Sequence, residues 1–470
     1  MLRTASEVRA SLKRRDLTSG SIFGNLLYFS VPYLISCFLQ TFYGLADLFI
    51  TGRFNGASTI SAVAIGSQLM HMLTVIIVGL AMGATVSIGN AVGAKDAREA
   101  GRNIGAAVSI FAVFSVLVTA LLILTRNPIL RILSTPPEAF EEASRYVLIC
   151  FIGVPFITAY NVISSIFRGL GDTKSPMIFV FAAGVINVIL DYILIGPLAM
   201  GAMGAALATV ISQALSVLLA LLFLRNALKP RDAQAAPAIL KLQDLKPDGQ
   251  VLSRILKVGI PVACQDGLIQ ISFLVITAIA NSRGVDVAAA VGIVEKIISF
   301  LFLVPSAMLS SVSAIAAQNA GAGEDDRALK TLHIAIGTCV VYGILTVIVC
   351  ELWTPQIVGL FTDQPAVVTL GSQYLRSYAF DTIAAGVHFC YSGFFCAYGK
   401  AVYSFIHNIA SIILMRIPGA WLASVLFPAT LLPMGAAAPL GSLLSAVICV
   451  FLCRHMLKSR NTQSAGGDSN

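Results

Sequence analysis

The chain has 470 residues, of which 57% are hydrophobic and only 11% are charged. Soluble domains carry about 25% charged residues, so this composition excludes an ordinary soluble protein. The net charge is +8, but the basic residues are spread over the polar segments between apolar runs, which argues against nucleic-acid binding. Residues 1–20 are polar and basic, and no signal-peptide cleavage pattern follows the first apolar run.

Apolar runs of about 18 residues or more recur from end to end, whereas the alternating segments of about 10 residues typical of β-barrels are absent. The sequence therefore predicts an all-α polytopic membrane protein. Twelve transmembrane helices are expected, in chain order, with centres near Leu39, Val75, Val113, Phe156, Gly184, Ala214, Ser272, Ser306, Tyr342, Ala384, Leu414 and Val447. Prolines predict kinks in four of them, because proline removes a helix hydrogen bond; these are Pro32, Pro155, Pro261 and Pro305.

Basic residues predict which side of the membrane each connecting segment faces. With the N-terminus inside, the inner segments hold 23 Lys and Arg residues and the outer segments hold 6. This bias predicts that both termini are cytoplasmic in a multi-pass protein of the plasma (inner) membrane.

The longest polar interruption divides the spans into two groups of six, and the two groups repeat. Ala62-Val-Ala-Ile65 recurs as Ala290-Val-Gly-Ile293, and Gly93-Ala94 recurs as Gly321-Ala322, both at an offset of 228 residues. Six is an even number, so the repeats are parallel, as in transporters that hold substrate between two lobes. The expected segments are a cytoplasmic N-terminal segment (1–20), an N-terminal six-helix bundle (21–225), a cytoplasmic linker (226–250), a C-terminal six-helix bundle (251–457) and a cytoplasmic tail (458–470).

Two isolated carboxylates lie in the apolar runs of the first half. Asn187 and Asp191 are four residues apart within the run 177–195, so they share one helix face, and Asp47 lies in the first run. A carboxylate at the membrane centre costs about 2.5–3.5 kcal/mol on insertion scales, and such residues face the bundle interior or water. The pair indicates a cation or proton site; the alternative is that each is a structural hydrogen-bonding residue.

The second half carries polar and aromatic residues that are candidates for a substrate cavity. Glu295 and Lys296 adjoin in the eighth span, where we expect them to line a hydrated cavity; the alternative is that they pair locally. Aromatic and charged groups of the tenth span predict a surface for a cationic, amphipathic ligand, with plain packing as the alternative. These residues are Asp381, His388, Tyr391 and Phe394.

No sequence signature of catalysis is present. The nine cysteines form no CxxC pair, so we expect small buried hydrophobic residues rather than metal or redox groups. GxxxxGK[ST], HExxH and GxSxG motifs are absent, which argues against ATP as the energy source and against an enzyme.

Together, these motifs resemble the multidrug and toxic compound extrusion (MATE) family, over about Gly24 to Leu457. The most specific are the loop between the fourth and fifth spans and the turn after the eighth. The motifs that carry the resemblance are Pro32 with Asp47, Gly93-Ala94, Arg168-Gly-Leu-Gly-Asp-Thr-Lys-Ser-Pro176, Asn187 to Asp191, Val294-Glu-Lys-Ile297 with Pro305, and Ala317-Gln-Asn-Ala-Gly321.

The resemblance implies a twelve-span antiporter with two pseudo-symmetric six-helix bundles. Such a protein exports drug-like, often cationic compounds in exchange for Na+ or H+. It needs no cofactor beyond the coupling ion, and its partners are small molecules and the lipid bilayer; we expect a monomer. In one branch the cation site carries over here as Asp47, Asn187, Asp191 and Thr209.

A second branch of the family uses acids of the C-terminal bundle. This chain offers Asp266, Glu295 and Asp381 there, but the acid position of the seventh span has no clean match, which favours the N-terminal site. Carboxylate, amide and hydroxyl oxygens suit a hard cation such as Na+, and desolvated carboxylates can also exchange protons. The sequence leaves the choice between Na+ and H+ open.

Other functions remain as alternatives. A flippase for lipid-linked oligosaccharides of the same superfamily would have a more basic cavity. Here the basic residues within the spans are Lys296 and Arg416, against five acids, a balance that suits cationic substrates. A channel or receptor is a further alternative, against which the two-lobe repeat argues.

Overall fold

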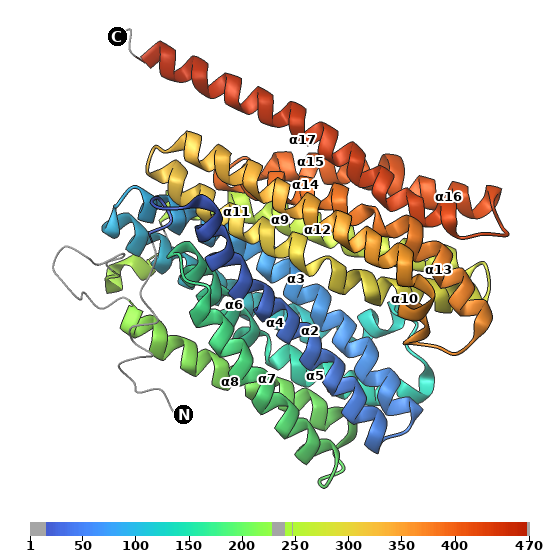
Figure 1. Cartoon of the computed structure of the whole chain (residues 1–470). Coiled ribbons are helices and arrows are strands. Elements are labelled where there is room, and N and C mark those ends of the chain that lie inside the picture. The colour runs from blue at the N-terminus through green and yellow to red at the C-terminus, as the bar shows by residue number, and fades with distance from the viewer. Residues whose placement is uncertain (1–15, 228–239, 247, 468–470) are drawn as a thin grey trace, which may run out of the picture. The chain divides into compact units, whose positions relative to one another are not determined.

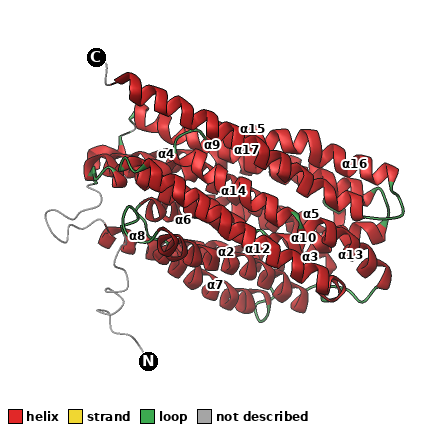
Figure 2. Ribbon diagram, turned by 45° about the horizontal axis from the view of Figure 1, so that its top comes forward, coloured by secondary structure: helices red, strands yellow, loops and turns green. Residues whose placement is uncertain are grey.

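The computed structural model describes residues 16–227, 240–246 and 248–467. In these ranges the chain is helical, without strands, and short loops join the helices (Figure 2). Most of the predicted N-terminal segment (1–15), the middle of the predicted linker (228–239) and the end of the predicted tail (468–470) lie outside the described residues.

The helices follow the predicted spans in order (Figure 1). Those of the first half are α2 (Ile22–Phe54), α3 (Ala57–Gly93), α4 (Ala97–Ile132), α5 (Pro137–Ile152), α6 (Val154–Gly169), α7 (Lys174–Ile195) and α8 (Gly201–Ala227). After the short helix η1 (Leu242–Leu245), the second half holds α9 (Gly249–Asn281), α10 (Val285–Leu301), α11 (Leu303–Gly321), α12 (Asp325–Gly359), α13 (Pro365–Ala379), α14 (Asp381–Ala397), α15 (Ala401–Ser411), the π-helix η2 (Ile412–Arg416), α16 (Ile417–Leu426) and α17 (Leu432–Gly467).

Several spans consist of consecutive helices with a break between them. α5 and α6 meet at Gly153, next to Pro155, and their axes differ by 46°. α10 and α11 break at Phe302, close to Pro305. Both breaks lie beside a proline whose kink the sequence predicts. Within the described residues, ten helical segments are long and apolar enough to cross a membrane, and the bent pair of α5 and α6 makes eleven. With α13 and α14 taken as one further span, the helices form two groups of six, and the predicted fold class is confirmed.

The chain divides into two compact units. Of the described residues, unit 1 comprises those within 16–20, 27–259 and 321–323, and unit 2 comprises those within 21–26, 260–320 and 324–467. The helix bounds repeat as the sequence motifs do: α3 spans Ala57–Gly93, and α10 with α11 spans Val285–Gly321, so both ends are displaced by 228 residues.

Unit 1 has an apolar core around Tyr146 and Phe151, which are almost fully buried. Gly66 of α3 allows α5 to approach, because a Cβ at this position would lie 2.2 Å from a ring carbon of Tyr146. The Tyr146 hydroxyl is 3.0 Å from the hydroxyl of Ser67. Small residues on α3 therefore set the close contact between α3 and α5.

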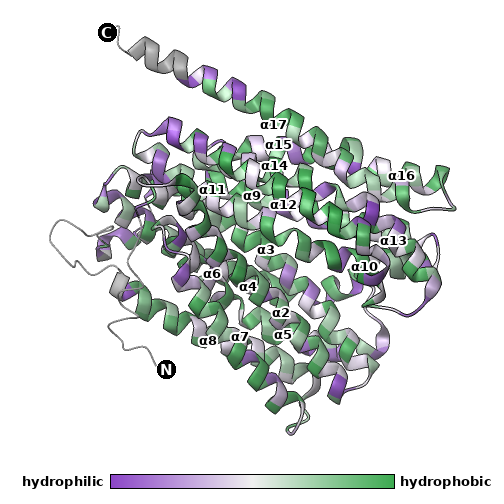
Figure 3. Cartoon of the chain, viewed as in Figure 1, coloured by the Kyte–Doolittle hydropathy of each residue, from purple (hydrophilic) through white to green (hydrophobic). Residues whose placement is uncertain are grey.

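Apolar side chains also cover the outside of both units. Phe49 is 77% exposed and Leu124 is 81% exposed, as expected for side chains that face lipid rather than water. Hydrophilic residues gather at the helix ends and in the loops, whereas the middle parts of the helices are mostly hydrophobic (Figure 3). This distribution is that of a multi-pass membrane protein.

The loop before α7, which belongs to the motif at residues 168–176, caps the N-terminus of that helix. The Asp172 carboxylate accepts hydrogen bonds from the backbone N–H groups of Lys174 (2.9 Å) and Ser175 (3.1 Å), which lie in the first turn of α7. It thereby satisfies donors that the helix itself cannot pair. Arg168 is buried and donates to the Ser165 hydroxyl at 2.6 Å. These residues fix the entry to the helix that carries Asp191.

Candidate functional site

Three helices of unit 1 bring the four predicted coupling residues together. Asp47 lies on α2, Asn187 and Asp191 on α7, and Thr209 on α8. The exposed fraction is 5% for Asp47, 2% for Asn187 and 0% for Asp191. The Asp47 carboxyl lies close to the side chains of the other three. Their joint role in coupling stays a prediction, but their proximity is a feature of the fold.

Most polar atoms of this cluster lack a hydrogen-bond partner in the described chain. Both carboxylate oxygens of Asp191, both polar atoms of the Asn187 amide and Oδ1 of Asp47 are buried without one. Thr209 donates its hydroxyl hydrogen to the carbonyl of Ala205 at 3.0 Å, which leaves oxygen lone pairs available. Buried polar atoms nearly always have a hydrogen-bond partner. This set therefore indicates a site for a ligand that several oxygen atoms can contact at once.

The cluster also contains no positive charge. The groups that act on Asp47 are Asp191, Asn187 and Thr209, and the group that acts on Asp191 is Asp47; within the described residues neither acid is influenced by a lysine or arginine. Burying an unpaired carboxylate costs several kcal/mol, so the pair requires a proton or a bound cation. An all-oxygen set of this kind suits a hard monovalent ion.

In unit 2 the predicted cavity residues differ in exposure. Lys296 is exposed and Glu295 is partly buried, with Thr277 donating its hydroxyl to the Glu295 carboxylate at 3.2 Å. Asp381 and Phe394 are fully buried. His388 and Tyr391, at 6% and 9% exposed, are also buried, so four of the six predicted cavity residues lie inside the unit. Their contact with substrate stays a prediction.

Arg416 of unit 2 is a partly buried basic residue within a predicted span. It is the last residue of the π-helix η2, just before Pro418. Its guanidinium donates to the Tyr378 hydroxyl at 2.5 Å and lies 4.6 Å from the centre of the Phe273 ring. Its charge acts on both Asp381 and Glu295. A lone arginine in an apolar span is the sequence signal for such a residue, but it does not reveal which acids the arginine faces.

Two histidines of unit 2, His388 and His407, lie close together. The rings of His388 and His407 are 5.4 Å apart. Nε2 of His407 is 3.0 Å from the Ser392 hydroxyl, and its Nδ1 is 3.3 Å from the Ser445 hydroxyl. Both nitrogens of His407 thus have partners, as expected for a structural polar residue inside a bundle.

Comparisons with known proteins agree with the fold and identify the family. The MatE family model matches residues 32–193 and 261–422, once in each half. Probable multidrug resistance protein YpnP of Bacillus subtilis is 30% identical over 417 residues, which cover 87% of this chain and 92% of that protein. Multidrug export protein MepA of Staphylococcus aureus (strain NCTC 8325 / PS 47) is 26% identical over 388 residues, covering 81% and 82%.

Solved structures show the same fold. The outward-facing conformation of a multidrug resistance MATE family transporter of the MOP superfamily matches with a TM-score of 0.87 at 21% identity, covering 96% of this chain and 99% of that chain. A MOP superfamily transporter from Pyrococcus furiosus matches with a TM-score of 0.86 at 21% identity, covering 94% and 97%. Since the family model matches both halves and the alignment with YpnP covers 87% of the sequence, the chain belongs to the MatE family of membrane transporters and is not an enzyme.

Proposed function

We propose that the protein is a secondary antiporter of the plasma (inner) membrane that exports drug-like organic compounds in exchange for Na+ or H+. The observation that carries this proposal is the buried cluster of Asp47, Asn187, Asp191 and Thr209, which combines two carboxylates with unsatisfied oxygens and no positive charge. The multidrug relatives support the drug-like substrate class.

The cluster binds the coupling cation because the cation supplies the missing positive charge. Carboxylate oxygens of Asp47 and Asp191 neutralise it, while the Asn187 carbonyl and the Thr209 hydroxyl add uncharged ligands. Binding of the cation and binding of the exported compound are linked, and the linkage is reciprocal. If the bound cation lowers the affinity for the drug, the bound drug lowers the affinity for the cation by the same factor.

The charge of the exported compound decides which driving force the exchange can use. One monovalent cation exchanged for one monocationic drug moves no net charge, so only the concentration gradients drive the exchange. A neutral drug exchanged for one cation moves one charge, and the membrane potential then adds about 2.3 kcal/mol per 100 mV. The proposal includes a monomer in the lipid bilayer with both termini in the cytoplasm.

Flux of a fluorescent organic cation in proteoliposomes tests the proposal, with Na+ and H+ gradients imposed separately. One of the two gradients should drive dye movement in wild-type protein, and Asp191→Asn should not respond to it. The matched control is Asp286→Asn, which removes an exposed acid of α10. Dye movement that neither gradient changes would refute the antiport function.

A further inference from the structure

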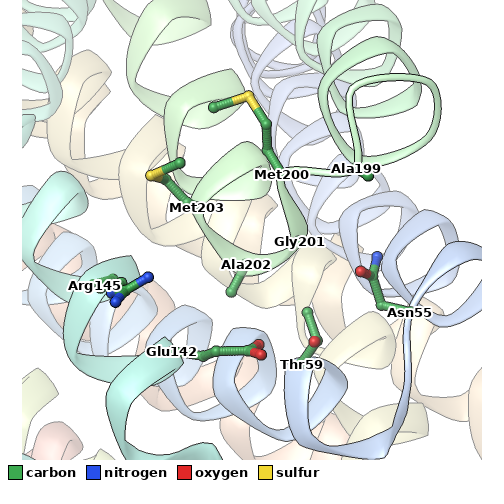
Figure 4. Close-up of a pocket in the computed structure, with 9 residues that line it drawn as sticks. All are labelled: Asn55, Thr59, Glu142, Arg145, Ala199, Met200, Gly201, Ala202 and Met203. Carbon is green, nitrogen blue, oxygen red and sulfur yellow. The ribbon is translucent and has the colours of Figure 1, made fainter.

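A pocket opens at the end of unit 1 that carries the loops at 55–56, 133–136 and 196–200. Its volume is about 240 Å³. This exceeds the roughly 10–15 Å³ that one water molecule needs, so a monovalent ion with part of its hydration shell fits. The residues that line it include Asn55, Thr59, Glu142, Arg145, Ala199, Gly201 and Met203 (Figure 4).

The pocket contains an acid without a counter-charge. The Glu142 carboxylate is directed toward Thr59 (Figure 4), and its Oε2 atom is buried without a hydrogen-bond partner within the described chain. Arg145 does not neutralise it by an ion pair, because its guanidinium binds Glu141 at 2.5 Å in a pair whose side chains are 66% and 80% exposed. Glu141, Glu142 and Arg145 together carry one net negative charge, which favours a cation in the pocket.

The pocket lies on the continuation of the helices that carry the cation cluster. Asn55 directly follows the end of α2, eight residues after Asp47, and Gly201 begins α8, eight residues before Thr209. Eight residues of helix correspond to about 12 Å. Asp191 lies one turn before the end of α7, and the loop that follows α7 contributes Ala199 to the pocket. Each of the three helices thus leads from a coupling residue to the pocket wall.

We propose that this pocket is the outer vestibule of the cation site, where the coupling cation binds as a partly hydrated monovalent ion before it reaches Asp47 and Asp191. The inference rests on the proposed antiport function, and on the predicted topology that places this end of unit 1 outside. Glu142 raises the local concentration of the cation and the rate at which it arrives, since a charged recess concentrates counter-ions. It does not take part in coupling itself.

The kinetic test compares Glu142→Gln with Glu138→Gln. Glu138 lies one turn earlier on α5, is exposed and does not line the pocket, so its substitution controls for surface charge. We expect Glu142→Gln to raise the KM for the external coupling cation by about 3- to 10-fold, at the low end of electrostatic steering effects, with Vmax within about twofold of wild type. The effect should shrink at high ionic strength, because salt screens the attraction.

The possible outcomes separate this inference from the function on which it rests. Wild-type protein that responds to neither gradient would refute the antiport function. If wild type is coupled to a cation gradient but Glu142→Gln and Glu138→Gln have the same KM for that cation, only the vestibule is refuted.

A labelling test decides the same point without measuring transport. Met203 lines the pocket and is 39% exposed, so Met203→Cys offers a thiol there. In intact cells, a cationic membrane-impermeant thiosulfonate should modify this thiol faster than an anionic one of similar size, with wild-type protein as the background. Adding Glu142→Gln should remove the preference. Equal rates for the two reagents, or no labelling from outside, would overturn the vestibule.

Discussion

Both units bury carboxylates at membrane depth, but the two units compensate the charge differently. In unit 1, Asp47 lies close to Asp191, to the Asn187 amide and to the Thr209 hydroxyl. No basic residue of the described chain acts on either acid. In unit 2, Asp381 and Glu295 lie within the field of Arg416. These two acids of unit 2 therefore have a positive charge within the unit, whereas Asp47 and Asp191 of unit 1 need one from outside.

This difference supports the proposal that the coupling site lies in unit 1. Charges interact strongly where water is scarce, so an internal guanidinium competes with any cation that approaches the acids of unit 2. In unit 1 a proton or Na+ meets no such competitor. The predictions below test this asymmetry, starting with the largest expected effect.

Removing either acid of unit 1 should abolish coupled export. Asp47→Asn and Asp191→Asn keep the shape of the side chain but remove the negative charge that binds the cation. Dye export under the driving gradient should fall to the level of protein-free liposomes, while expression and the thermal midpoint stay at or above those of wild type, because each variant loses a buried unpaired charge. Full efflux by either variant at normal expression would contradict the site.

The same variants identify the coupling ion. At 100 times its Kd, a ligand that binds only the native state stabilises it by about 2.7 kcal/mol. If Na+ is the ion, NaCl should raise the thermal midpoint of wild type, whereas choline chloride should not. NaCl should not raise the thermal midpoint of Asp191→Asn. If only the proton acts, the two salts should have the same effect on wild type.

Removing the internal cation of unit 2 should damage stability more than coupling. Arg416→Gln leaves Asp381 without its counter-charge and Glu295 with Lys296 alone, at an expected cost of about 3–5 kcal/mol in the free energy of unfolding. Thermal unfolding in detergent measures the loss. The double variant with Asp381→Asn should recover part of it. Arg376→Gln is the control, because its pair with Glu351 is exposed and should contribute less than about 1 kcal/mol.

If Arg416→Gln unfolded at the same temperature as wild type, the comparison between the units would lose its basis. The acids of unit 2 would then not depend on Arg416 for compensation of their charge.

Neutralising Glu295 should alter substrate choice by an intermediate amount. Its carboxylate is only partly buried and its contacts include Thr277, so an organic cation has better access to it than to the fully buried Asp381. Glu295→Gln should lower kcat/KM for a monocationic dye by about 1–3 kcal/mol, that is, about 5- to 150-fold, and should spare a neutral dye of similar size. Equal losses for both dyes would assign Glu295 to structure or gating.

The smallest effect concerns the polar end of unit 1, where acids do pair with arginines. Asp244 of η1 accepts hydrogen bonds from Arg98 (2.6 Å) and from the backbone of Lys241 (2.7 Å). Burial raises the pKa of Asp244, but these two partners outweigh it and hold the pKa below its ordinary value of 3.8. Because the pKa is lowered in the folded protein, the stabilisation is present at neutral pH and is lost as the pH falls through and below 3.8.

Asp244→Asn should therefore increase amide hydrogen exchange in residues 241–246 at pH 7, with less than about 1 kcal/mol of change in overall stability. The difference from wild type should shrink as the pH falls below 3.8, because Asp244 of wild type then becomes protonated as well. Unchanged exchange at pH 7 would show that the η1 segment is held by other contacts.

Much of the architecture was predictable because its signals are local. Span length and hydropathy are properties of consecutive residues, and the breaks near Pro155 and Pro305 follow from the missing N–H of proline. The isolated acids Asp47 and Asp191 were visible for the same reason, since a charge in an apolar run stands out whatever the fold. Glu142 gave no such signal, because it lies in a polar segment at a helix end where acids are common.

The sequence by itself determined a membrane protein of twelve helices in two repeated halves, and it marked Asp47 and Asp191 as unusual, because the bilayer penalises each charge wherever its helix is placed. Only the tertiary structure decided which charges meet. Packing of α2, α7 and α8 brings Asp47 to Asp191 without a basic neighbour. Packing of the π-helix region brings Arg416 to Asp381. Electrostatic energy depends on distance in space, and residues far apart in the chain acquire that distance only when the helices pack.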